Sequence, residues 1–191
     1  MATFLVVVSI GVTFPAMVYG WSGNIELFGD WYRTVTSSTT SNLLGSDNIS
    51  LAGMWTKWLG SGAVAATLAA LSSLAALGLG VVVWLKRDAV PSPAYLEVSL
   101  LMLLVPLLSP QGWDYVLLLA TPAVVCLIDR WHQVSRRWQW LTGFALATMG
   151  FTVFDVMGRT LYEHFMATSA ISVCAILLAI ALTHLRWTKL A

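Results

Sequence analysis

Charged residues are scarce in this sequence, since Asp, Glu, Lys and Arg make up only 10% of its 191 residues. An average soluble domain has about 25%. This scarcity excludes an ordinary soluble enzyme, a disordered chain and a nucleic-acid-binding protein, and the net charge of +1 gives no sign of a polyanionic partner. Cysteine is also scarce: Cys126 and Cys174 lie within apolar runs, which indicates small core residues without disulfide or metal spacing.

Sequence motifs of cofactor chemistry are missing as well. His132, His164 and His184 have no paired ligand spacing, and the sequence contains neither a zinc motif nor a phosphate-binding glycine loop. We therefore expect neither a metal nor a cofactor.

Apolar residues are abundant, at 58% of the chain, and occur in runs that predict an all-α membrane protein. A bilayer-spanning helix needs about 20 residues. The predicted set of about six transmembrane helices covers residues 2–20, 63–85, 95–108, 113–128, 140–154 and 165–185. The third and fourth are short and separated by residues 109–112, which favours a tight helical hairpin and leaves open whether it crosses the full thickness.

The sidedness of the charges orients these helices. Seven of the ten Lys and Arg residues fall in one set of loops and six of the nine acids in the opposite set. Since basic loops stay inside, the chain is predicted to be a multi-pass protein of the plasma membrane with both termini cytoplasmic. Seven of the ten Trp fall at predicted span ends, as in an interfacial aromatic belt.

The only long predicted loop is the outer one, residues 21–61. Its polar tract, residues 36–42, is predicted to be mobile. The second half contains an amphipathic pattern, for which we predict an interfacial helix over about residues 47–59 with Asp47 or Asn48 as its N-cap. The stripe is formed by Leu51, Met54, Trp55, Trp58 and Leu59. This helix either covers the bundle, which the pattern alone favours, or shapes a site for a lipid-linked substrate.

Asp114 is the most suggestive polar residue, because it follows Trp113 at the start of the fourth predicted span. A carboxylate at membrane depth is costly and is a functional candidate by default. The alternative is a hydrated acid that the dipole of a helix N-terminus favours. The spacing of the residues alone favours neither interpretation of Asp114 over the other.

Residues 107–122, which begin Leu-Leu-Ser-Pro-Gln-Gly-Trp-Asp-Tyr, resemble the Ser-Pro-x-x-Trp-Asp segment of glycosyltransferase family 87. Residues 47–51, Asp-Asn-Ile-Ser-Leu, are similar to the family's Asn-Gln-Ser-Leu segment. Tyr115 and Val116 stand where the family often has His, and Ile49 replaces its usual Gln.

The resemblance implies a fold like the C-type glycosyltransferases. It also implies transfer of a hexose, such as mannose, from a polyprenyl-phosphate sugar donor to a lipid or glycan acceptor on the outer face of the membrane bilayer. The substrate-binding residues it implies are Asn48, Ser50, Ser109, Trp113, Asp114 and Tyr115. Asp114 would have a supporting role, because the family's proposed catalytic acid has no counterpart here and the catalytic residues stay unknown.

We expect residues 1–191 to form a single transmembrane domain that matches the C-terminal portion of a family 87 enzyme, with the N-terminal half as its partner. The alternative is a non-catalytic multi-span module, such as a transporter subunit or an assembly scaffold. Charges inside the predicted spans are sparse, which argues against an ion or proton relay.

Overall fold

The computed structural model describes residues 2–89, 93–152 and 154–189, and every secondary-structure element in these ranges is a helix. The predicted all-α class is confirmed. The chain divides into two compact units, residues 1–41 and residues 42–191, and each is described by itself.

The first unit contains α1 (Ala2–Thr13) and most of α2 (Ala16–Leu43). The chain bends by 84° between the two helices. The buried side chain of Asn24 donates a hydrogen bond to the Val12 carbonyl across the bend, at 3.0 Å. A second break lies at Gly20, whose φ of 70° is a left-handed conformation that glycine adopts without steric cost.

Helix α2 continues through residues 21–43, where we had predicted a loop. The prediction rested on the tract at residues 36–42, which is polar and low in complexity. In the structure the Ser37 hydroxyl donates to the Thr34 carbonyl of the same helix, at 3.1 Å. The tract is therefore compatible with a helix.

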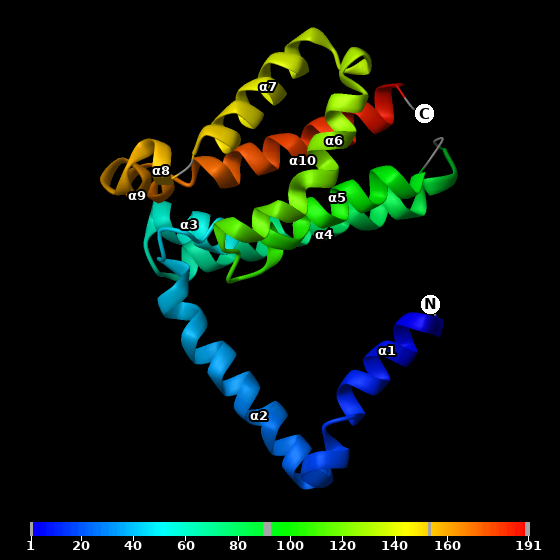
Figure 1. Cartoon of the computed structure of the whole chain (residues 1–191), viewed down its shortest axis with the longest axis vertical. Coiled ribbons are helices and arrows are strands. Elements are labelled where there is room, and N and C mark those ends of the chain that lie inside the picture. The colour runs from blue at the N-terminus through cyan, green and yellow to red at the C-terminus, as the bar shows by residue number, and fades with distance from the viewer. Residues whose placement is uncertain (1, 90–92, 153, 190–191) are drawn as a thin grey trace. The chain divides into compact units, whose positions relative to one another are not determined.

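The second unit is built around α10 (Ala170–Lys189), which packs against α5, α6 and α7 (Figure 1). Its buried face is a row of small and medium side chains at helical spacing, with Cys174, Leu178, Leu182 and Leu185 no more than 3% exposed. The surrounding helices are α4 (Ala63–Leu85), α5 (Pro93–Leu108), α6 (Thr121–Asp129) and α7 (Arg136–Phe151).

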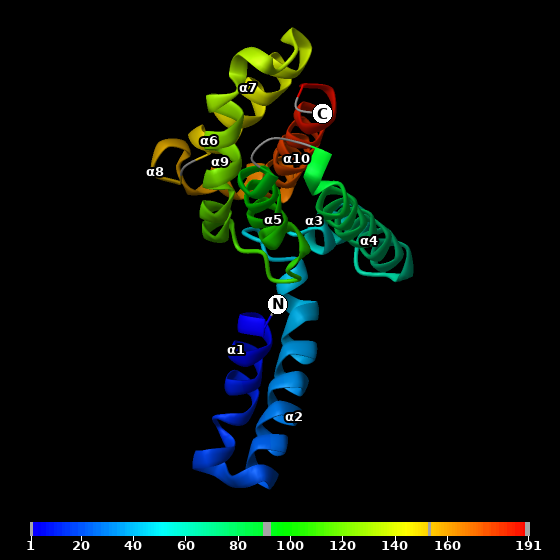
Figure 2. The ribbon, with the colours of Figure 1, turned by 90° about the vertical axis from the view of Figure 1, so that its right-hand side faces the viewer.

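Short elements connect these helices. Helix α3 (Leu51–Leu59) precedes α4, and α8 (Phe154–Met157) and α9 (Arg159–Ala167) connect α7 to α10. Three single-turn or two-turn 3₁₀ segments complete the unit: η1 (Arg87–Ala89), η2 (Asp114–Ala120) and η3 (Trp131–Gln133). Figure 2 shows α4 at the edge of this unit, with α3 and α5 on its inner side.

Two helices in the described ranges are long and apolar enough to cross a membrane, residues 63–85 and 170–187. A bent third candidate arises if residues 5–13 of α1 and residues 16–35 of α2 count as one span. This is fewer than the six spans predicted. Helices α5 and α7 have 16 residues each, or about 24 Å at 1.5 Å per residue, against a hydrocarbon core of about 30 Å.

The fourth predicted span is broken for a local reason. The chain leaves α5 through residues 109–112, forms the 3₁₀ segment η2, and becomes α-helical only from Thr121, where Pro122 occupies the first turn. Helix α6 then has nine residues. As the predicted hairpin requires, η2 and α6 pack back against α5.

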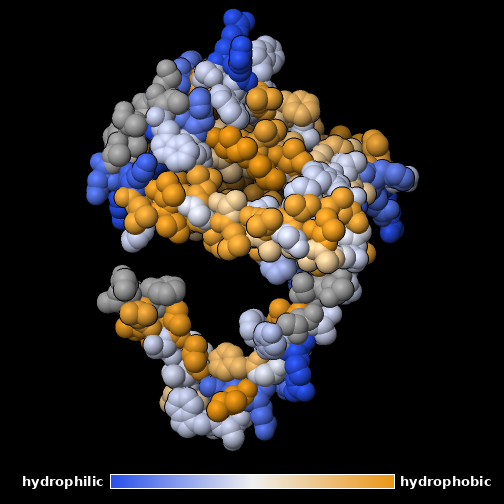
Figure 3. Space-filling view, turned by 180° about the vertical axis from the view of Figure 1, so that it is seen from behind, coloured by the Kyte–Doolittle hydropathy of each residue, from blue (hydrophilic) through white to orange (hydrophobic). Residues whose placement is uncertain are grey.

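One face of the second unit is strongly apolar (Figure 3). Only 6% of the most apolar window of α4 is buried, compared with 61% for α10. Large side chains such as Leu71, Leu74 and Leu85 are more than half exposed. Soluble proteins rarely expose so large an apolar patch, so this surface supports association with a membrane.

Candidate functional site

Helix α3 lies where the amphipathic pattern predicts a helix, over Leu51–Leu59. Its N-cap is Ser50, whose hydroxyl oxygen accepts a hydrogen bond from the Gly53 N–H at 3.0 Å. The predicted cap, Asp47 or Asn48, was therefore wrong. The side chain of Asn48 stabilises the turn just before the helix, since its oxygen accepts a hydrogen bond from the Ser50 N–H at 2.9 Å.

The predicted apolar stripe of α3 is only partly buried. Leu51 and Met54 are 4% and 3% exposed, whereas Trp58 and Leu59 are about half exposed. Trp55 lies between these extremes, and its indole N–H donates to the Ser72 hydroxyl of α4 at 3.1 Å. One half of the stripe thus fixes α3 to the bundle and the other half stays on the surface.

Asn48 joins the segment before α3 to the turn after α5. Its amide nitrogen donates to the Pro110 carbonyl at 2.9 Å, and the neighbouring Ile49 N–H donates to the Gly112 carbonyl at 2.7 Å. Asn48 and Trp113 form an isolated antiparallel bridge. The structure therefore brings together the two segments that resemble family 87, although about sixty residues separate them in the chain.

This close approach depends on two glycines. A Cβ atom on Gly112 would lie 2.1 Å from the Pro106 carbonyl oxygen, and a Cβ atom on Gly53 would lie 2.8 Å from the Asn48 side chain. Real Cβ atoms do not approach other atoms so closely. Gly112 is therefore required for the segments to meet, since the obstruction is backbone, and a side chain at position 53 would displace the Asn48 side chain.

Asn48 and Ser50 were predicted to bind substrate, and the structure gives both side chains internal partners. They are 4% and 0% exposed. The Asn48 amide nitrogen also donates to the Asn42 carbonyl, at 3.1 Å. Ser109 is half-buried in the turn that Asn48 holds. What the structure shows for Asn48 and Ser50 is a role in positioning; direct contact with a substrate stays a prediction.

Asp114 begins η2 and has an aromatic residue on each side of it in the sequence. Trp113 and Tyr115 are 38% and 67% exposed, and their rings are stacked with centroids 6.4 Å apart. One carboxylate oxygen of Asp114 accepts a hydrogen bond from the Tyr115 N–H at 2.7 Å. The other accepts from the hydroxyl of Tyr162, on α9. The carboxylate is half-buried, so part of it stays open to a ligand.

Tyr162 is a site residue that the sequence analysis missed, and no spacing in the sequence connects it to Asp114. Burial raises the pKa of Tyr162 above its usual value of 10, and the hydrogen bond to Asp114 raises it further. The phenol therefore stays protonated at physiological pH. It acts as a permanent donor that fixes the orientation of the Asp114 carboxylate.

Lys57 is the second missed residue. Its ammonium donates to three backbone carbonyls, those of Ser46 at 2.7 Å, Asn48 at 2.8 Å and Met166 at 3.1 Å. Burial lowers the pKa of Lys57 from 10.5 to about 8, although the charge of Asp47 acts in the opposite direction. Lys57 thereby ties α3 to the end of α9.

Two further hydrogen bonds fix α3 and the segment before it to the end of α9 and to α10. The Trp58 indole donates to the Thr168 carbonyl at 3.0 Å, and the Ser172 hydroxyl donates to the Ile49 carbonyl at 2.8 Å. The segment before α3 is thus hydrogen-bonded both to the turn after α5 and to α10.

A groove of about 530 Å³ begins at Asp114 and Tyr115 and continues along η2 and α6 toward Ile128. Its opposite wall comes from Leu146 and Met149 of α7. Apart from Asp114 at its start, its walls are mainly apolar. The arrangement is a carboxylate and the exposed ring of Tyr115 at one end of an apolar groove, with the Trp113 ring stacked with that of Tyr115. It suits a ligand with a polar head and a hydrocarbon tail.

Comparison of this chain with models of protein families, with curated proteins and with solved structures found no match. The resemblance of residues 47–51 and 107–122 to family 87 therefore stays a prediction.

Proposed function

We propose that this chain functions in a membrane glycosyltransferase, in which residues 47–51 and 107–122 help bind a polyprenyl-phosphate hexose such as a mannose donor. The observation that supports this most strongly is the bridge between Asn48 and Trp113. Two segments that were selected together, for resemblance to one family, lie against each other and next to a groove with a carboxylate at its head.

In this proposal the Asp114 carboxylate accepts hydrogen bonds from sugar hydroxyls, while the exposed faces of Trp113 and Tyr115 pack against the sugar ring. Tyr162 holds the carboxylate in place. The groove along η2 and α6 takes the first isoprenoid units of the lipid. Asn48 and Ser50 are positioning residues, because their buried side chains hold the backbone that carries the site.

The reaction that the resemblance implies is an inverting transfer to a lipid or glycan acceptor. The acceptor hydroxyl attacks the anomeric carbon, the bond from that carbon to the phosphate oxygen breaks, and the lipid phosphate leaves with the electron pair. A base takes the hydroxyl proton. We assign no residue described here as that base.

We further propose that the chain is a multi-pass protein of the plasma membrane with both termini in the cytoplasm. In this topology η2 and the start of α3 face outward, and the shorter α5, α6 and α7 complete the bundle beside the two long helices. Single cysteines at Ser46 and at Arg137, in a Cys126→Ser, Cys174→Ser background, test it in intact cells. A membrane-impermeant maleimide should label position 46 and leave position 137 unlabelled; the reverse pattern would contradict the orientation.

The binding proposal is tested with the purified chain in lipid nanodiscs and radiolabelled polyprenyl-phosphate mannose. Asp114→Asn should weaken binding about tenfold or more, as expected for the loss of a charged hydrogen-bond acceptor. Asp155→Asn is the matched control, because Asp155 is an exposed acid on α8 outside the groove. Equal affinities for the unchanged chain and Asp114→Asn would overturn the proposal.

A non-catalytic module remains the second candidate, and the internal bonding of Asn48 favours it, since this amide serves the fold without any ligand. A transporter subunit would move a labelled solute across liposomes that contain the chain. Flux without binding of the sugar lipid would support this candidate.

A further inference from the structure

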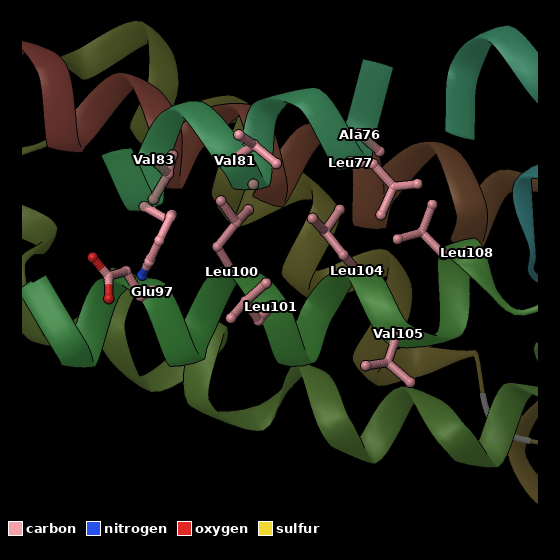
Figure 4. Close-up of a pocket in the computed structure, with 12 residues that line it drawn as sticks. Ala76, Leu77, Val81, Val83, Glu97, Leu100, Leu101, Leu104, Val105 and Leu108 are labelled. Atoms are coloured by element: carbon pink, nitrogen blue, oxygen red, sulfur yellow. The ribbon is translucent and has the colours of Figure 1, made fainter. Parts of the chain in front are cut away.

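A second groove, separate from the one at Asp114, lies between α4 and α5. Its volume is about 510 Å³ and its walls are almost wholly apolar. Figure 4 shows Leu77 and Leu108 at one end, Val83 and Glu97 at the other, and aliphatic side chains between them. Since α4 is barely covered by other helices, the groove opens to whatever surrounds this helix.

Glu97 is the only charged residue among the described residues that line this groove. Its side chain is 12% exposed, and Oε2 lies 3.6 Å from a guanidinium nitrogen of Arg87. Oε1 is buried and has no hydrogen-bond partner among the described residues. A buried carboxylate oxygen without a donor is costly, so this end of the groove favours a ligand that donates hydrogen bonds.

Positive charge gathers at the same end. The guanidinium of Arg186 is 2% exposed and donates to the Val83 carbonyl at 2.8 Å and the Lys86 carbonyl at 2.9 Å. Its second terminal nitrogen is buried without a partner, and no carboxylate of the described residues lies within 4.0 Å of it. Lys86 and Arg87 are exposed beside it, as is the acid Asp88, so the three bases at this end exceed the two acids, Glu97 and Asp88, by one charge.

The groove is apolar along its length, and at one end the hydrogen-bond acceptor Glu97 lies near basic side chains. This combination matches one kind of membrane lipid. We infer that the groove between α4 and α5 binds phosphatidylethanolamine. An acyl chain lies along the groove, the primary ammonium donates to Glu97, and the phosphate lies toward Lys86 and Arg87.

Other lipid headgroups match less well. The choline of phosphatidylcholine carries a positive charge but has no N–H to donate to Oε1 of Glu97. Phosphatidylglycerol has no cation to place against the carboxylate. The comparison of these three lipids therefore separates recognition of the headgroup from simple burial of acyl chains.

The test is native mass spectrometry of the full chain, released from membranes that contain the three lipids in equal amounts and with distinct acyl masses. The unchanged chain should retain phosphatidylethanolamine several-fold over each of the others. Glu97→Gln should reduce that preference to about one. Glu163→Gln, an exposed acid of α9 that pairs with Arg159, is the matched control and should keep the preference.

A second variant tests the groove itself. Leu101→Trp enlarges a groove-lining side chain and should reduce the retained lipid while the headgroup preference of the remainder stays. Equal retention of all three lipids, preference for phosphatidylglycerol, or an unchanged preference in Glu97→Gln would each overturn the inference. So would a lipid-free dimer closing the groove. None of these results depends on sugar binding at Asp114.

Discussion

The hydroxyl of Tyr162 donates a hydrogen bond to the Asp114 carboxylate, although 48 positions separate the two residues in the chain. This bond connects η2, which begins at Asp114, to α9, which carries Tyr162. It leaves the carboxylate oriented and partly open beside the rings of Trp113 and Tyr115. The ring of Tyr162 also contacts that of Phe154 edge to face, with centroids 5.7 Å apart, so the phenol is held from two directions.

Tyr162→Phe removes only the donor in this pair and keeps the ring contact with Phe154. We expect the free energy of unfolding in detergent to fall by about 1 kcal/mol, because a hydrogen bond to a half-buried carboxylate is lost. Binding of polyprenyl-phosphate mannose should weaken several-fold as Asp114 loses its fixed orientation. Tyr19→Phe, at a side chain that is 60% exposed, is the control. Unchanged stability and binding in Tyr162→Phe would show that the bond is unimportant.

Asn48→Ala removes both bonds that the amide donates and the one that its oxygen accepts. We expect a loss of about 2–3 kcal/mol in the free energy of unfolding, since three hydrogen bonds of a buried side chain are lost together. Chemical denaturation followed by near-ultraviolet circular dichroism measures it.

The control for Asn48→Ala is Ser46→Ala, which removes one bond from a half-buried hydroxyl to Asp47 and should cost less than about 0.5 kcal/mol. If the two substitutions cost the same, the Asn48 side chain does not hold the two segments together.

Gly112→Ala places a methyl group against the Pro106 carbonyl oxygen and the Ser50 side chain. We expect a loss of about 3 kcal/mol or more, because the obstruction is backbone that cannot rotate away. Gly78→Ala is the opposite case, since a Cβ atom there meets nothing within 4 Å and the residue lies inside α4. It should stabilise the chain by about 0.5–1 kcal/mol. Thermal unfolding of both variants decides whether the close approach at Gly112 is real.

Lys57 should titrate near pH 8, because burial lowers its pKa from 10.5. Reductive ¹³C-methylation of the lysines and a pH series by NMR measure this midpoint, and Lys57→Arg identifies the resonance by its disappearance. A midpoint near 10 would show that the ammonium is not held as the structure places it.

The lowered pKa of Lys57 also predicts how the free energy of unfolding changes with pH. Between pH 8 and 10.5 the folded chain binds fewer protons at Lys57 than the unfolded chain does, so the free energy of unfolding rises with pH across this window. We expect a gain of about 1 kcal/mol, because the side chain is partly exposed to screening solvent. Lys57→Met lacks the group that titrates, and its stability should rise less over the same interval.

Local patterns in the sequence predicted part of this fold. The spacing of Leu51 and Met54 predicted α3, because one helical face needs only neighbours three and four residues away. Long apolar runs predicted α4 and α10 in the same way. The turn at residues 109–112 was also predicted, as the middle of a hairpin. The 3₁₀ segment η2 was not, because hydropathy, which measures composition, does not distinguish a 3₁₀ segment from the start of an α-helix.

The candidate site was predictable only in part. Segments 47–51 and 107–122 were both selected from the sequence, yet their pairing depends on the bond from Asn48 to the Pro110 carbonyl, 62 residues away. The bond from Lys57 to the Met166 carbonyl spans 109 residues. Such contacts form when helices pack, and no periodicity within one helix encodes which residue of another helix it will meet.

The most direct test of the account locates the sugar on the chain. A polyprenyl-phosphate mannose with a photoreactive diazirine on the sugar is bound to the unchanged chain in nanodiscs and irradiated, and the labelled peptides are sequenced. The account predicts labelling at residues 113–115 or at Tyr162, abolished by excess unmodified donor. Labelling that is confined to other helices, or that resists competition, would contradict a sugar-binding site at Asp114.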